Sequence, residues 1–261
     1  MIVQAEPVMG TVVSFHVFSG PVPEAETRAA VDKACELLHR HDEVFSTWRP
    51  ESPMSRLRTG ELALAEAPPE IAAVLELCRE AKQMTCGWFD PWAMPGGVDP
   101  TGLVKGWAAA RALEVLERAG VDAAIVNAGG DVASLGRPPG GGRWKVGINH
   151  PWRADALACV LEIEAAVATS GCYERGAHLI DPTDGSTPTS VASATVTGPH
   201  LAFVDALATA VAVAGDRGMD LVRSLEGYDA YIIRVDGTED ATAGIAFADA
   251  LDGSQRTRRV S

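Results

Sequence analysis

The segment LAFVDALATAVAVAG, at residues 201–215, constrains the fold more than any other part of this 261-residue chain. It is apolar at nearly every position, so a helix formed from it is hydrophobic on all sides and has to be surrounded by the rest of the protein. The segment is too short to span a bilayer, and Asp205 interrupts it. We therefore expect a globular chain with a buried helix at about residues 200–214, and no insertion into a membrane.

Helices and strands are predicted on both sides of this segment, without the strict βαβ alternation of a doubly wound sheet. Hydrophobic spacing and β-branched residues predict strands at residues 11–18, 122–127, 144–149, 158–163, 167–169, 191–197 and 228–235. Helices are predicted at residues 23–44, from residue 68 to just before 87, at 105–119 and at 219–225. Residues 46–60 and most of 87–107 are rich in Ser, Pro and Gly and are predicted to be loops. The expected fold is α+β, with sheets packed against helices, in a single domain over residues 1–261 that has two closely joined lobes.

The charge and the cysteines limit the partners and the compartment. A formal net charge of −13 repels polyanions, so nucleic acid is not expected as a partner, and a phosphate site needs a local cation, a metal or backbone N–H groups. The five cysteines form no CxxC pair and are predicted to be reduced thiols. The first residues, MIVQAEPVMGTVV, lack the basic stretch and apolar run of a signal peptide, so we expect a cytoplasmic protein.

Asp205 and Thr209 are the most informative polar pair in the chain. They lie four residues apart in a predicted helix and therefore point the same way. A buried carboxylate is costly unless a cation meets it, and a carboxylate with a hydroxyl suits Mg²⁺, which completes its shell with phosphate and water. The structural alternative places Asp205 in the first turn, where the helix dipole favours it, with Thr209 bonding back to a carbonyl.

Three further features could contribute to a site. His178 lies in a loop close to Asp181 and could be a general base near neutral pH, although a lone histidine is more often structural. Lys105-Gly106 opens a predicted helix, where an ammonium and N–H groups could meet phosphate. The sequence NAGGD at residues 127–131 follows a strand, and its paired glycines would let backbone approach a ligand. The last two features could equally be simple turn chemistry.

The order of the motifs is more specific than any one of them. Along the chain they are Met9-Gly10-Thr11, Ser46-Thr47-Trp48, Phe89-Asp90-Pro91, Lys105-Gly106, NAGGD, Thr169-Ser170-Gly171, His178-x-Ile180-Asp181-Pro182 and Asp205-x-x-x-Thr209. This arrangement resembles the FAD:protein FMN transferase (ApbE) family over about residues 9–215.

The resemblance implies an α+β fold related to the T-fold, with the substrate FAD in a central cleft. It implies Mg²⁺ held by the side chains of Asp205 and Thr209 and by main-chain oxygens of Gly102 and Ala208. His178 corresponds to the family's candidate base, so His178 and Asp205 are the expected catalytic residues. The residues expected to contact FAD are Met9, Trp48, Trp88, Phe89, Asp90, Asp99, Lys105 and Ile180.

The activity that the resemblance implies is cleavage of FAD, release of AMP and transfer of FMN, through a phosphoester, to a Thr or Ser of a target flavoprotein. Three alternatives stay open: hydrolysis of FAD to FMN and AMP, binding of FAD without turnover, and a soluble domain whose polar pair is structural. Two departures from the family pattern also matter. The span between Asp90 and Asp99 is short, and Arg58 stands where the family often has Asn.

Overall fold

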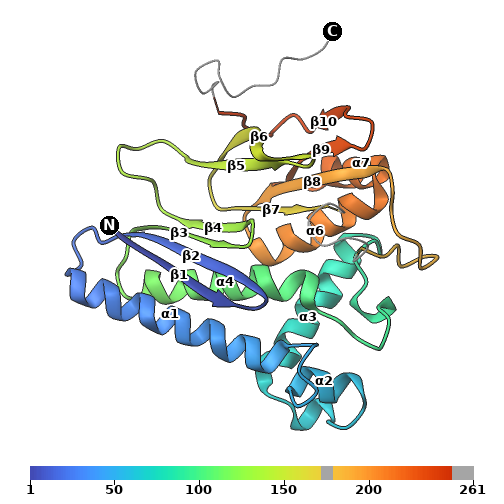
Figure 1. The fold of residues 1–261 in the computed structure, drawn as a ribbon, viewed down its shortest axis with the longest axis horizontal. Coiled ribbons are helices and arrows are strands. Elements are labelled where there is room, and N and C mark those ends of the chain that lie inside the picture. Colours follow the sequence, from blue (N-terminus) through green and yellow to red (C-terminus); the bar gives the residue numbers. More distant parts are fainter. Residues whose placement is uncertain (172–178, 249–261) are drawn as a thin grey trace.

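The computed structural model describes residues 1–171 and 179–248, and its main feature is an eight-stranded sheet (Figure 1). The strand order is β1-β2-β3-β4-β7-β8-β9-β10, and every neighbouring pair is antiparallel. A separate two-stranded sheet consists of β5 and β6. The strands are β1 (Ile2–Val8), β2 (Thr11–Phe18), β3 (Ala123–Ala128), β4 (Asp131–Leu135), β5 (Trp144–His150), β6 (Arg153–Ile163), β7 (Ala166–Ser170), β8 (Val191–Gly198), β9 (Asp229–Arg234) and β10 (Glu239–Ala241).

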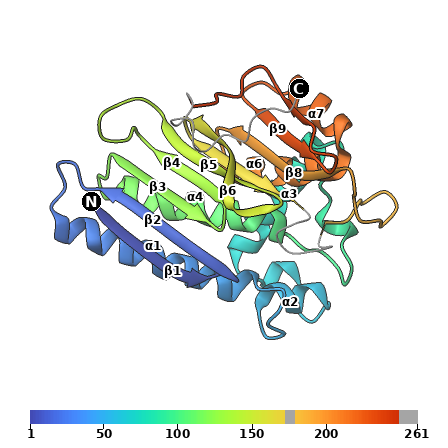
Figure 2. The ribbon, with the colours of Figure 1, turned by 45° about the horizontal axis from the view of Figure 1, so that its top comes forward.

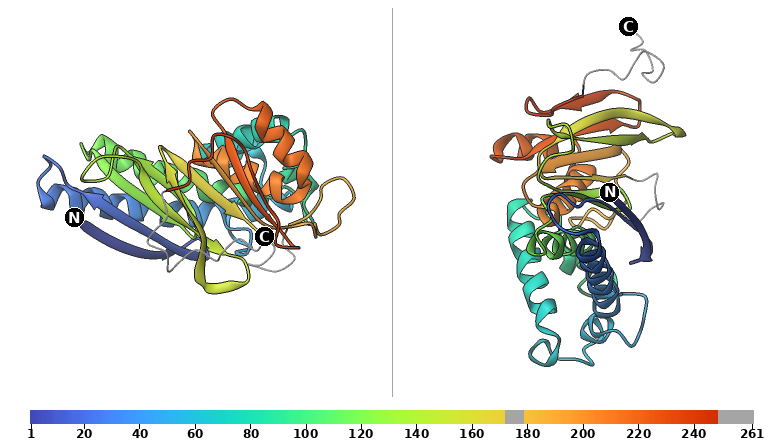
Figure 3. Two further views of the ribbon diagram at one scale, coloured as in Figure 1. Left: turned by 90° about the horizontal axis from the view of Figure 1, so that it is seen from above. Right: turned by 90° about the vertical axis from the view of Figure 1, so that its left-hand side faces the viewer.

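The helices lie mainly on one side of the large sheet. They are α1 (Glu24–Phe45), α2 (Pro53–Arg58), α3 (Pro69–Met84), α4 (Thr101–Arg118), α6 (Leu201–Ala214) and α7 (Asp216–Ser224), with short 3₁₀ turns η1 (Leu64–Glu66) and η2 (Pro91–Ala93). Helices α4 and α6 pack directly on the sheet, α1 packs on the edge strand β1 and on α4, and α3 lies further out (Figures 1 and 3). The small β5–β6 sheet lies on the opposite side of the large sheet, where the view of Figure 2 brings it forward. The predicted α+β class is confirmed, and the two lobes within one domain stay a prediction.

Helix α6 is the buried helix that the apolar segment predicts. All of its residues except Phe203, Thr209 and Ala214 are buried. It is enclosed because β7 and β8 cover one side and α4 and α3 cover others. The approach of α4 is close: a Cβ built on Gly106 would lie 2.7 Å from the carbonyl oxygen of Leu201. In the part of the chain that the structure describes, no helix is both long and apolar enough to cross a membrane.

Helix α4 begins earlier than predicted, which corrects the expected role of Lys105-Gly106. The helix starts at Thr101, whose N–H donates to Oδ1 of Asp99 at 3.0 Å. Lys105 and Gly106 therefore lie inside the helix and do not offer its N-terminal N–H groups to phosphate. The Gly and Pro residues before them suggested irregular backbone, because glycine disfavours a helix when packing is ignored.

The sequence also missed α2 and the strands β1, β4 and β10. Helix α2 lies in a predicted polar loop, yet its start carries a capping signal: Oγ of Ser52 accepts the N–H of Ser55, and Pro53 follows the cap. Strand β1 contains Glu6 and Pro7, which weaken a strand prediction but are tolerated because β1 is at the edge of the sheet.

Candidate functional site

Asp205 lies where α4 and α6 cross. The residue is 4% exposed, and its Oδ2 accepts the N–H of Gly106 at 3.2 Å. A side chain at Gly106 would collide with α6, so glycine is what allows the carboxylate to approach the α4 backbone. Helix α6 begins at Leu201 and has no acidic residue in its first turn. The alternative that the helix dipole explains Asp205 is therefore wrong.

Thr209 is one helical turn beyond Asp205 and meets residues from two other elements. Its Oγ1 lies 3.3 Å from Oγ of Ser170 at the end of β7. A Cβ built on Gly102 of α4 would lie 3.8 Å from the same Oγ1 and 3.1 Å from the ring of Phe89. Gly102, Phe89, Ser170 and Thr209 thus converge. A side chain at Gly102 would press on the Phe89 ring, so glycine is what lets α4 lie this close to Phe89 and to the Thr209 hydroxyl.

Three of the residues predicted to contact FAD are held in ion pairs. Nζ of Lys105 lies 2.6 Å from Oδ2 of Asp131. Nζ of Lys82 lies 2.7 Å from Oδ2 of Asp90, and Nη1 of Arg58 lies 3.3 Å from Oδ2 of Asp99. Each pair restrains a charged side chain. Each pair also sets a cation beside a carboxylate and so offsets its negative charge, in a chain whose net charge of −13 repels anions.

Arg58 explains how the short span before Asp99 is organised. Besides its ion pair with Asp99, its Nη2 donates to the carbonyl oxygen of Pro95 at 2.9 Å. Gly97 lies against the Arg58 backbone, since a Cβ there would be 3.1 Å from the Arg58 carbonyl oxygen. The loop before α4 is therefore wrapped around one guanidinium. Arg58 was visible in the sequence only as a departure from the family pattern, and its partners were not predictable.

The other residues predicted to contact FAD differ in how far they are exposed and in what they pack against. Trp48 is 92% exposed, so its indole is available to a flat ligand. Met9 has a positive φ of 56°, and both Met9 and Trp88 pack against two of the hydrophobic core clusters. Ile180 is half-buried. His178, the predicted base, lies outside the described residues.

The residues around Thr209 fit a hard divalent cation. The oxygen atoms predicted to hold it are the carboxylate of Asp205, the hydroxyl of Thr209 one helical turn away, and main-chain oxygens of Gly102 and Ala208 on the same two helices. Oxygen donors of this kind suit Mg²⁺. Within residues 1–171 and 179–248, no three His, Cys, Asp or Glu side chains gather in a way that could hold a metal. Mg²⁺ commonly takes only one or two carboxylates and completes its shell with water and phosphate, so a site with one carboxylate is compatible with it.

Comparison with known proteins identifies the family. A sequence profile described as the ApbE family matches residues 9–97 and 94–232, which together are most of the chain. The chain belongs to the ApbE family. The FAD:protein FMN transferase of Treponema pallidum (strain Nichols) is 28% identical, over 93% of this chain and 87% of that protein. The FAD:protein FMN transferase of Rhodobacter capsulatus is 33% identical, over 68% of this chain and 38% of that protein.

Solved ApbE structures have the same fold. The ApbE protein from Thermotoga maritima superposes with a TM-score of 0.82 at 22% identity, over 93% of this chain and 97% of that one. The flavin transferase ApbE from Vibrio cholerae gives a TM-score of 0.78 at 21% identity, with the same two coverages. The ApbE-like architecture that the motifs predict is therefore confirmed.

Proposed function

We propose that this ApbE family member is a FAD:protein FMN transferase. It cleaves FAD, releases AMP and attaches FMN through a phosphoester to a Thr or Ser of an acceptor flavoprotein. The observation that carries the proposal is the crossing of α4 and α6, where Asp205 accepts the Gly106 N–H and the Thr209 hydroxyl lies beside Gly102, with the Lys105 ammonium on the same α4. Full-length similarity to a protein named for this activity supports it.

In this proposal the protein supplies charge and position. Lys105 attracts the diphosphate of FAD, which an otherwise acidic chain would repel. Asp205, Thr209 and the main-chain oxygens of Gly102 and Ala208 hold Mg²⁺, which when bound neutralises charge on the phosphates. Trp48, Trp88, Phe89, Met9, Asp90, Asp99 and Ile180 line the FAD site.

The transfer itself forms one bond and breaks one. The acceptor hydroxyl oxygen bonds to the phosphorus of the FMN half, and the bond from that phosphorus to the bridging oxygen breaks, so that AMP leaves with this oxygen. His178 is the proposed base that takes the hydroxyl proton. The Thr or Ser motif of the acceptor and the cytoplasmic compartment stay predictions from the sequence.

Mass spectrometry of the acceptor tests the proposal. The protein is incubated with FAD, Mg²⁺ and a panel of candidate acceptor flavoproteins, and we expect one acceptor to gain the mass of FMN while AMP appears in equal amount. Release of free FMN and AMP with every acceptor would identify a FAD hydrolase instead. FAD that stays intact with Mg²⁺ present would indicate a protein that binds FAD without turnover.

A further inference from the structure

Asp131 and Lys105 form a buried ion pair beside the residues proposed to hold Mg²⁺. The Lys105 side chain is 20% exposed, and the Asp131 side chain is 1% exposed. The turn between β3 and β4 places Asp131, because Gly129 and Gly130 both have positive φ. Gly129 also lies against Thr11, where a Cβ would be 2.4 Å from Oγ1. The carboxylate therefore comes from a tight turn whose backbone lies against Thr11 of β2.

Strand β7 connects this ion pair to Thr209. Oδ1 of Asp131 lies 3.4 Å from the backbone nitrogen of Thr169, which is a long contact. The next residue, Ser170, has its Oγ 3.3 Å from Oγ1 of Thr209. Two adjacent residues of one strand thus contact the carboxylate that holds Lys105 and the hydroxyl proposed to hold Mg²⁺. Strand β7 therefore links the Lys105–Asp131 ion pair to the Thr209 hydroxyl.

Stability alone is a weak reason for this pair. A buried ion pair contributes little compared with an apolar replacement, because both ions lose their water. A lysine side chain is long and flexible, so an unrestrained ammonium would sample many positions. An ammonium carries three N–H donors and can contact a carboxylate and a phosphate at once. The pair is therefore better suited to fixing a cation in place than to stabilising the fold.

We infer that Asp131 is a positioning residue, which holds the Lys105 ammonium in the orientation that receives the diphosphate of FAD. Asp131 acts through Lys105 and does not itself contact the substrate. This inference rests on the proposed function, since it takes the diphosphate to be the group that Lys105 meets.

A double-mutant cycle on FAD affinity tests the inference. Asp131→Asn keeps the shape of the side chain and removes its charge, and Lys105→Met removes the ammonium. We expect either change to weaken FAD binding by about tenfold to a hundredfold, the range for hydrogen bonds to charged groups. The double variant should bind FAD no more weakly than Lys105→Met alone, because the inference has Asp131 act only through Lys105. The two losses adding together would overturn the inference.

Steady-state kinetics supply a second reading that a purely structural role would not give. Asp131→Asn should raise KM for FAD by more than it lowers kcat, since the lost interaction is with bound FAD. Equal KM values in the wild type and Asp131→Asn would contradict the inference. If Asp131→Asn does not fold, the double variant, which removes both charges, is compared with Lys105→Met. Further loss of FAD affinity in the double variant would then overturn it, and equal affinity would support it.

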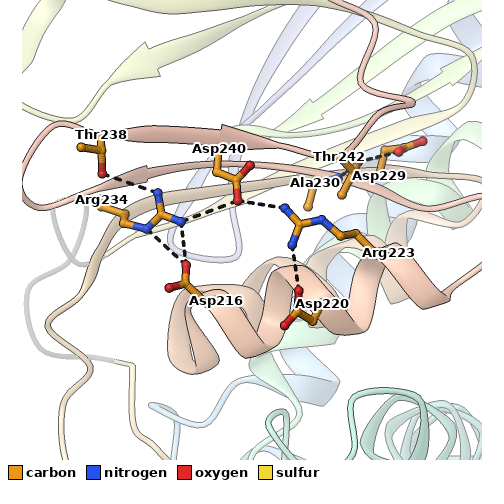
Figure 4. Close-up of polar contacts among 9 residues, drawn as sticks. All are labelled: Asp216, Asp220, Arg223, Asp229, Ala230, Arg234, Thr238, Asp240 and Thr242. Carbon is orange, nitrogen blue, oxygen red and sulfur yellow. Dashed lines mark hydrogen bonds and ion pairs between the residues drawn. The ribbon is translucent and has the colours of Figure 1, made fainter.

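The matched control is Asp240→Asn in the surface ion-pair cluster of α7, β9 and β10, which should leave FAD affinity unchanged (Figure 4).

The proposed function and the proposed role of Asp131 fail in different ways. If the wild-type protein does not bind FAD at all, the proposed function is wrong. If the wild type binds FAD and Asp131→Asn binds it equally well, only the role of Asp131 is wrong.

Discussion

Two groups of charged side chains in this molecule differ mainly in their exposure to water. In the surface cluster, Asp240 lies between Arg223 and Arg234, which also contact Asp220 and Asp216 respectively (Figure 4). There, five partly exposed or exposed side chains satisfy one another and join α7 to β9 and β10. The buried group lies between helices and sheet and includes Asp131 and Asp205, each almost fully enclosed.

The comparison teaches that a carboxylate's surroundings decide what it can do. Removing a surface carboxylate that lies between two arginines should cost the protein little stability, because water and salt screen the ion pairs. When a nearby cation keeps a buried carboxylate ionised, the two interact more strongly than they would in water, so such a carboxylate can direct a cation or a metal. The predictions below test that difference, from the largest expected effect to the smallest.

Replacing Asp205 by Asn should cause the largest loss. The amide keeps an oxygen that can accept the Gly106 N–H, so the protein should fold, but the negative charge proposed to hold Mg²⁺ disappears. We expect FMN transfer to fall by at least about a thousandfold, or ~4 kcal/mol in activation free energy. The measurement is the rate of acceptor labelling at saturating Mg²⁺, with thermal unfolding as the control for folding. Full activity in this variant would refute the metal assignment.

His41 should make stability depend on pH. The residue is 3% exposed, and its ring lies 4.4 Å from that of Trp107. Burial lowers the pKa of His41 from 6.5 to about 4. As the pH falls from about 6.5 to about 4, the unfolded chain takes up a proton that the folded chain refuses. The free energy of unfolding should therefore drop over this window by up to about 3 kcal/mol.

Chemical denaturation at a series of pH values measures the His41 effect. His41→Leu removes the titrating group, so its stability should lack this part of the pH dependence. Parallel curves for the wild type and His41→Leu between pH about 6.5 and about 4 would contradict the assignment.

Ser170→Ala should weaken the response to Mg²⁺ by a smaller factor. If the Thr209 hydroxyl donates its proton to Oγ of Ser170, its lone pairs are left directed at the proposed cation. Without Ser170 the hydroxyl can rotate, and we expect the Mg²⁺ concentration for half-maximal activity to rise about tenfold. Ser224→Ala on the exposed end of α7 is the control. An unchanged Mg²⁺ requirement would mean that Ser170 does not orient Thr209.

Asp240→Asn should have the smallest effect. It removes the carboxylate that two arginines share, and we expect a loss of at most about 1 kcal/mol in unfolding free energy. The loss should shrink further in high salt, because exposed ion pairs are screened. Denaturant titration measures this loss of unfolding free energy. A loss as large as that expected for a buried carboxylate would contradict the difference between the surface cluster and the buried group.

The sequence predicted what depends on local pattern. Helix α6 follows from its composition, and the four-residue spacing of Asp205 and Thr209 places both on one side of it. The ion pair of Lys105 with Asp131 was not predictable, because the two residues lie on different elements and nothing local links them. The early start of α4 was missed for a related reason. Gly102 looks like a helix breaker until its neighbour Phe89 is known.

The bare backbone of Gly106 has a consequence for anyone who tries to redesign this protein. Helices α4 and α6 approach so closely at Gly106 that even one methyl group there would push Leu201 away. Because Asp205 is on the same stretch of α6, that displacement would carry the carboxylate with it. Substitutions at this crossing should therefore act on catalysis and on folding together, and libraries that vary α4 are best built with residue 106 left untouched.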